Sequence, residues 1–77
     1  MTEYLEFGGQ RYRIRQALYS APDFTVYELI DAIMLNGPVQ FLAVTTDQRL
    51  YSIDVFEGND ENVLLKDYGY ASVVVVC

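Results

Sequence analysis

The sequence predicts an α+β fold: a small, mainly antiparallel sheet of about five strands, in the order ββαβββ, with one helix packed on a face. Three observations predict it. Residues 10–19 alternate between apolar and polar side chains, residues 25–36 carry a helical apolar stripe, and residues 39–56 have the pattern of a β-hairpin. A chain of 77 residues has room for a single domain, 1–77. The alternative fold is an all-β, SH3-like barrel.

The first two strands are expected to form a hairpin. Residues 4–7 are followed by Gly8 and Gly9, and a glycine pair accepts the positive φ angles of tight hairpin turns. The second strand would place its apolar residues on one face and its arginines on the other: Tyr12, Ile14 and Leu18 against Arg11, Arg13 and Arg15. This alternation is typical of a half-buried strand with a basic outer face.

Residues 25–36 are expected to form a helix of about three turns. Their apolar side chains recur with a helical period and form one stripe: Val26, Leu29, Ile30, Ile33 and Met34. Thr25 and Glu28 have the spacing of a capping box, and Gly37 with Pro38 would end the helix. The β-branched and aromatic residues of this segment favour a strand instead.

A second hairpin is expected from residues 39–46 and 49–56, around a turn at Asp47 and Gln48. Its inner face would bring Leu42 and Val44 opposite three residues of the following strand: Tyr51, Ile53 and Val55. A polar loop over residues 57–62 comes next, then a short apolar element over residues 63–65 and a turn or bulge at residues 68–70.

The last expected strand covers residues 71–77. Its four consecutive valines, Val73 to Val76, do not alternate with polar residues. A strand that is apolar on both faces is either central in its own sheet or covered by a partner. The sequence therefore predicts that this strand is covered on both faces, by its own sheet or by another chain.

Charge is unevenly distributed along the chain, whose net charge is −6. Residues 1–21 carry three arginines and two glutamates, a net of +1, while residues 22–77 carry nine acids against Arg49 and Lys66, a net of −7. Such a field repels nucleic acid and anionic lipid and attracts basic surfaces. The expected partner is a protein with a basic surface, without direct binding of nucleic acid or of a membrane.

The expected compartment is the cytoplasm. The single cysteine, Cys77, excludes an internal disulfide, and the N-terminus has an acid where a signal peptide has basic residues. The longest wholly apolar run is five residues, whereas about 20 are needed to cross a bilayer.

Catalytic and metal-binding groups are scarce. The chain has no histidine, so neither a Ser-His nor a Cys-His pair can form, and zinc-ligand spacings are missing. Lys66 is adjacent to Asp67, the pattern of a solvated surface pair, and residues 57–62 lack the ligand register of a calcium loop. We therefore expect no enzymatic activity, no metal and no cofactor.

The residues expected to contact a partner are four acids and three tyrosines. The acids lie within eight positions of one another and create a strong local negative potential, and tyrosine is favoured at interfaces for its large rigid ring and polar tip. The set is Asp54, Glu57, Asp60, Glu61, Tyr27, Tyr68 and Tyr70. The arginines at positions 11, 13 and 15 either form a ladder that binds anions or pair with Glu3 and Glu6 across the first hairpin.

These observations predict a non-enzymatic, acidic protein–protein interaction module. A concrete version is an inhibitor whose carboxylates occupy the nucleic-acid-binding surface of its partner. In size and charge, though not in any motif, the chain resembles small acidic phage anti-defence proteins, including anti-CRISPR proteins. The alternative is a homo-oligomeric structural or accessory protein, such as a homodimer, that pairs through its valine-rich C-terminal strand. A third alternative is a small-molecule binding domain.

Overall fold

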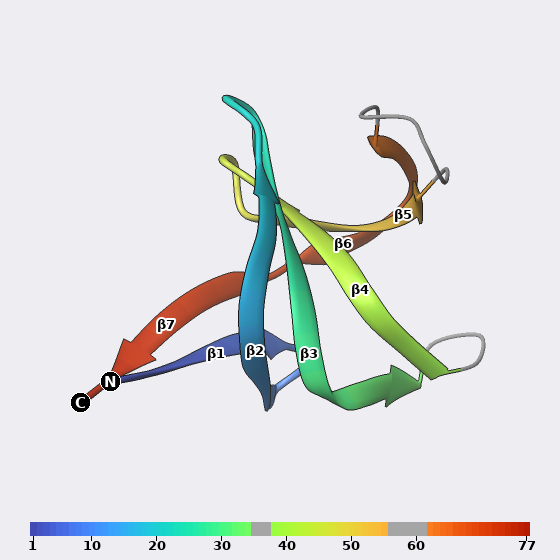
Figure 1. Cartoon of the computed structure of the whole chain (residues 1–77). Coiled ribbons are helices and arrows are strands. Elements are labelled where there is room, and N and C mark those ends of the chain that lie inside the picture. The colour runs from blue at the N-terminus through green and yellow to red at the C-terminus, as the bar shows by residue number, and fades with distance from the viewer. Residues whose placement is uncertain (35–37, 56–61) are drawn as a thin grey trace.

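The structure, a computed structural model of the chain, is all-β rather than α+β (Figure 1). It describes the backbone of residues 1–34, 38–55 and 62–77 and the side chains of residues 1–30, 40–53 and 64–77. This part of the chain holds no helix and seven strands: β1 (Thr2–Phe7), β2 (Gln10–Ser20), β3 (Phe24–Met34), β4 (Pro38–Thr45), β5 (Arg49–Val55), β6 (Asn62–Tyr70) and β7 (Ser72–Val76). The predicted α+β class was therefore wrong, and only the all-β class of the alternative fits.

The strands form one open antiparallel sheet in the order β6-β5-β4-β3-β2-β1-β7. Its two edge strands, β6 and β7, are consecutive in the chain and are separated by Ala71 alone. The sheet is therefore curled, because the chain passes directly from one of its edges to the other (Figure 1). Ala71 is fully buried at this crossing, and its backbone N–H donates to the carbonyl oxygen of Gln48 over 3.0 Å.

Aliphatic side chains fill the interior of the curl. The buried cluster takes residues from β1 to β5 and from the crossing point: Leu5, Ile14, Leu29, Leu42, Val44, Leu50 and Ala71. Burying a leucine side chain contributes about 1.5–3 kcal/mol, so the four nearly inaccessible leucines supply much of the driving force. Partly buried rings and one valine pack around this cluster: Phe7, Tyr12, Tyr27, Tyr68 and Val73.

The first predicted hairpin is confirmed. β1 and β2 pair antiparallel, and the turn between them has Gly8 at φ 62° and Gly9 at φ 79°, the two positive angles that a type I′ turn requires. Ile14 is buried on the inner face as predicted. Leu18 is instead 47% exposed, because the register of β2 with β3 shifts between Ile14 and Gln16 and again between Ala17 and Tyr19.

The predicted helix is wrong, since the described part of residues 25–36 belongs to strand β3. This strand pairs antiparallel with β2 on one side and with β4 on the other. Thr25, Tyr27 and Leu29 lie on one face of the strand. Leu29 belongs to the interior cluster, and Tyr27 packs against it. Residues 35–37, where the helix was expected to end, lie outside the described residues.

Burial on both faces of β3 explains why its sequence resembles a helix. Val26 is buried as fully as Leu29, but it lies on the opposite face, directly across from Ala43 of β4. The same row of the sheet continues to Tyr19 on β2 and Tyr51 on β5, so the two small residues lie between two large rings. Val26 and Leu29 are therefore three positions apart and both apolar, which is also the spacing of a helical stripe.

The second predicted hairpin is confirmed, but the predicted face of its second strand is wrong. Val44 lies opposite Leu50 and Leu42 lies opposite Ser52, so Leu50 is the inner residue and Tyr51 is on the other face. The turn sets this phase: the N–H of Gln48 donates to the carbonyl oxygen of Thr45 over 3.0 Å, and Gln48 has a φ of 63°. A shift of one residue exchanges the two faces of a strand.

Residues 63–70, predicted as a short element and a turn, are part of the single strand β6. The irregularity expected near Gly69 is present, since this residue has a φ of 108° and the β5–β6 register shifts along the strand. The last predicted strand is confirmed as β7, which pairs with β1 in a regular register. The chain ends therefore lie together, with Thr2 opposite Val76 (Figure 1).

Candidate protein-binding surfaces

Most of the predicted acidic contact surface falls outside the described residues. Glu57, Asp60 and Glu61 all belong to residues 56–61, which the structure does not describe. The backbone of Asp54 lies in β5, opposite Val63 of β6. The structure thus gives a strand position for one of the four predicted acids.

Two other exposed carboxylates lie in neighbouring turns at one end of the sheet. Asp23 is in the β2–β3 turn and Asp47 is in the β4–β5 turn, and the N–H of Thr46 joins the turns by donating to the carbonyl oxygen of Asp23 over 3.0 Å. The Thr45 hydroxyl donates to the Asp47 carboxylate. Within the described residues neither aspartate forms a salt bridge. Both charges therefore face solvent at this end.

Among the acids whose side chains the structure describes, Asp67 has the most hydrogen-bond partners. Its carboxylate accepts from Nη2 of Arg49 at 2.9 Å and from Nε at 3.2 Å, while its second oxygen accepts from the N–H of Gly69 at 2.8 Å. The Tyr51 hydroxyl lies 3.4 Å away. The hydrogen bond with Arg49, followed by that with Gly69, lowers the pKa of Asp67 below its ordinary value. This carboxylate stays ionised, and it engages the guanidinium of Arg49.

Tyr27 does not fit the prediction of an exposed anchor. It is half-buried and packs against the interior cluster. Burial raises its pKa above 10.0, and the negative charge of Glu3 raises it further, while a hydrogen bond with Thr25 acts in the opposite direction. Its ring lines a cleft instead of projecting from the molecule.

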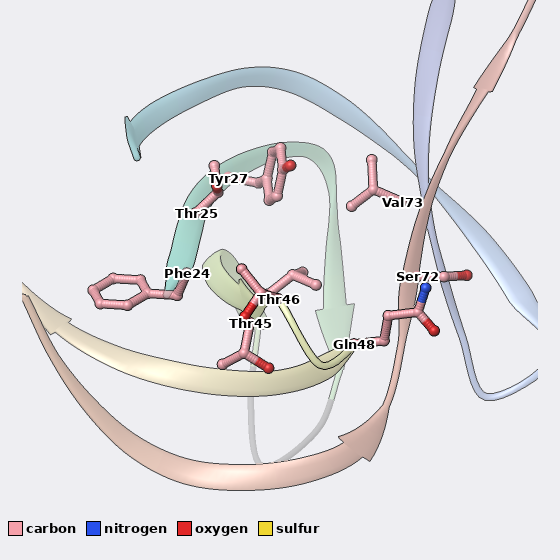
Figure 2. A pocket seen from close by; sticks show the side chains of 9 residues that line it. Phe24, Thr25, Tyr27, Thr45, Thr46, Gln48, Ser72 and Val73 are labelled. Carbon is pink, nitrogen blue, oxygen red and sulfur yellow. The ribbon is translucent and has the colours of Figure 1, made fainter. Parts of the chain in front are cut away.

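An uncharged cleft of about 200 Å³ lies beside Tyr27, between β3, the β4–β5 turn and the start of β7. Figure 2 shows Tyr27 and Val73 pointing into the same space from opposite walls. None of its nine lining residues is charged. Sequence reasoning missed this cleft because its walls come from segments that are far apart in the chain. Its volume is below the roughly 300–1,000 Å³ of ordinary ligand pockets.

Tyr68 and Tyr70 differ in exposure although they are two positions apart. Tyr68 packs against the interior cluster, and Nζ of Lys66 lies 5.2 Å from the centre of its ring. Tyr70 is 65% exposed and is the one predicted tyrosine that projects into solvent. The structure therefore does not bring the three predicted tyrosines together on one surface.

Of the three arginines of β2, one has the predicted pairing across the first hairpin. Arg11 Nε lies 2.8 Å from Oε2 of Glu6, its direct cross-strand neighbour, which confirms one pairing across the first hairpin. Arg13 lies opposite Tyr4, and neither it nor Arg15 forms a salt bridge within the described residues. The ladder is therefore partly neutralised, at its end nearest the turn.

Strand β7 is an unpaired edge in the part of the chain that the structure describes. It pairs with β1 through residues 72–76, and no described strand pairs with its other side. Val73 packs against the interior cluster, whereas Val75 and Val76 are exposed. The prediction that both faces of this strand are covered is therefore not met by its own sheet.

Other kinds of site find no support in the described residues. No three histidine, cysteine, aspartate or glutamate side chains gather there as metal ligands would, and the thiol of Cys77 is exposed. The described part also contains no helix long and apolar enough to span a membrane. Comparisons with protein-family models, with curated proteins and with solved structures found no match.

Proposed function

We propose that this chain is a non-enzymatic protein–protein interaction module whose acidic part, residues 22–71, binds a protein with a basic surface. The observation that carries the proposal is the separation of charge along the chain. The three strands at one side, β2, β1 and β7, hold three arginines, two glutamates and no other charge, a net of +1. Residues 22–71, which lead from the β2–β3 turn to the start of β7, hold the remaining net charge of −7.

Cations of the acidic part neutralise little of this charge. Residues 22–77 contain two cations, Arg49 and Lys66. Arg49 is engaged by Asp67, and the ammonium of Lys66 lies over the ring of Tyr68. Asp23 and Asp47 add exposed charge at the adjacent turns. The stability of the fold does not require this excess, because exposed like charges repel one another.

The partner's chemistry follows from the sign of this field. A surface with excess carboxylates accelerates encounter with basic surfaces and slows encounter with nucleic acid. A basic protein surface is often one that binds nucleic acid, so occupying such a surface would make this chain an inhibitor of its partner. Inhibition of this kind requires binding alone, which agrees with the scarcity of catalytic groups in the sequence.

The test uses two variants with the same change in charge. A partner is first captured on the purified chain and purified, and its association rate is then measured by surface plasmon resonance. Asp60→Lys with Glu61→Lys adds four positive charges to the acidic part, and Glu3→Lys with Glu6→Lys adds four to β1. We expect the first pair to slow association about tenfold at low salt and to flatten its salt dependence, and the second to change it much less. Equal effects of the two pairs, or an unchanged association rate in both, would contradict the proposal.

A further inference from the structure

The two edges of the sheet differ in their protection against pairing with another strand. Exposed edges are usually protected by charged side chains, glycine or proline, and irregular register. β6 has all but proline: Lys66 and Asp67 are exposed, Gly69 has a φ of 108°, and its register with β5 is irregular. β7 has none of these features, since its residues are one serine and four valines in a regular ladder with β1.

The unprotected edge is also suited to its own copy. In an antiparallel pair of β7 strands, each valine faces a valine or a serine, and no like charges meet. Every second residue of an edge strand directs its N–H and carbonyl groups away from the neighbouring strand, so these groups are available to a second chain. Val75, 55% exposed, would be covered by such pairing.

The distribution of charge indicates which partner takes this edge. Two copies that each carry a net charge of −6 repel one another over most of their surfaces. β7 lies at the side of the sheet whose strands sum to +1, next to β1 and β2. The β7 strand has no charged residue, and its neighbour β1 has two, of which Glu6 is paired with Arg11, so joining two copies there brings few like charges together. We propose that the chain forms a symmetric homodimer in which β7 pairs antiparallel with β7 of a second copy.

The register follows from full overlap of the five-residue strand. Residues 72–76 of the two copies overlap completely when Val74 lies on the two-fold axis, opposite Val74 of the second copy. In the β1–β7 ladder Val74 lies opposite Tyr4, so two rings and two valines form one apolar row across the junction. The two sheets are thus continuous across the β7–β7 junction. An interface this small predicts concentration-dependent dimerisation, because stable interfaces bury about 1,200–2,000 Å².

Sedimentation equilibrium tests the proposal with a matched pair of variants. Val75→Lys charges the β7 edge, and the new lysine lies opposite Glu3, which favours a folded monomer. Leu65→Lys charges the β6 edge at a residue of similar exposure, 58% against 55%. We expect the wild-type mass to rise towards twice 8.8 kDa with concentration. We also expect Val75→Lys to raise the dissociation constant about tenfold or more and Leu65→Lys to leave it within about twofold.

Two results would overturn the homodimer. One is a wild-type chain that stays monomeric up to millimolar concentration, and the other is dimerisation that both variants weaken equally. Repeating the measurement at high salt separates this inference from the proposed function. Salt weakens binding of a basic partner, but it does not weaken an uncharged β7 junction between two acidic copies. A monomer that still binds its basic partner in a salt-dependent way would overturn the homodimer and leave the proposed function standing.

Discussion

Nη2 of Arg49 lies 2.9 Å from Oδ2 of Asp67, and this pair joins β5 to β6 near one end of the sheet. Arg49 is one of two cations in the acidic part, and its hydrogen bond is the main reason that the pKa of Asp67 is lowered. A carboxyl group whose pKa is lowered by folding stabilises the folded state above its ordinary pKa. That stability is lost as the pH falls through the lower, folded-state value.

Replacing Asp67 by Asn should therefore destabilise the protein at neutral pH but not in strong acid. Asparagine keeps an acceptor for the N–H of Gly69 and removes only the charge that holds Arg49. We expect the difference in thermal midpoint between wild type and variant to be constant above the ordinary pKa of 3.8 and to shrink below it. Asp23→Asn, in an exposed turn, is the control. A difference that persists unchanged to pH 2 would show that the salt bridge is not its cause.

Leu29 and Ile30 distinguish a strand from a helix over residues 25–34. A helix would place both on one apolar stripe, whereas β3 buries Leu29 and leaves Ile30 40% exposed. Leu29→Ala should reduce the free energy of unfolding by about 2–5 kcal/mol, as for other buried leucines. Ile30→Ala should cost less than about 1 kcal/mol. Urea denaturation measures both values, and equal losses would favour the helix.

The pKa of Tyr27 should respond to the charge of Glu3. The charge of Glu3 contributes to the raised pKa of Tyr27, although β2 lies between their strands. Glu3→Gln should lower the pKa of Tyr27 while burial keeps it above the ordinary value. Glu6→Gln, whose carboxylate pairs with Arg11, should leave it unchanged. Titration of the Tyr27 ring by NMR checks this, with Tyr27→Phe for assignment; no response to Glu3→Gln would place the two groups farther apart.

Cysteine cross-linking tests the register of the proposed dimer. With Val74 on the two-fold axis, the two residues at position 74 have Cα atoms about 4.5–5.5 Å apart, within the range of a disulfide. The two copies of Cys77 would be about 20 Å apart, at 3.4 Å per residue. Mild oxidation should thus cross-link Val74→Cys in a Cys77→Ser background, but not the wild type. Efficient cross-linking through Cys77 would instead indicate a parallel or shifted arrangement.

Local turn and strand signals predicted much of the fold correctly. The Gly8–Gly9 turn, the second hairpin and the C-terminal strand all depend on residues close in sequence, and all are confirmed. The helix was wrong because burial on both faces of β3 is a property of the whole sheet. Val26 is buried and lies opposite residues of two other strands, Tyr19 of β2 and Ala43 of β4, which no local pattern reveals. Tertiary context overrides local propensity in such segments.

The candidate surfaces were less predictable than the fold. Tyr27, Tyr68 and Tyr70 look alike in the sequence, but the curl of the sheet turns the first two towards the core and leaves the third exposed. The run of valines at residues 73–76 did indicate an unusual strand. Its position at the edge of the sheet, however, follows from the crossing at Ala71, which joins β6 directly to β7.

Amide hydrogen exchange of residues 72–76, followed by NMR at low and high protein concentration, tests the central claim most directly. β7 pairs with β1 on one side and has no described partner on the other. At low concentration, the amides that point away from β1 should exchange rapidly while the alternate amides are protected. At high concentration the unprotected set should become protected as two β7 strands pair. Full protection at low concentration, or an unprotected set that stays unprotected at high concentration, would contradict the account.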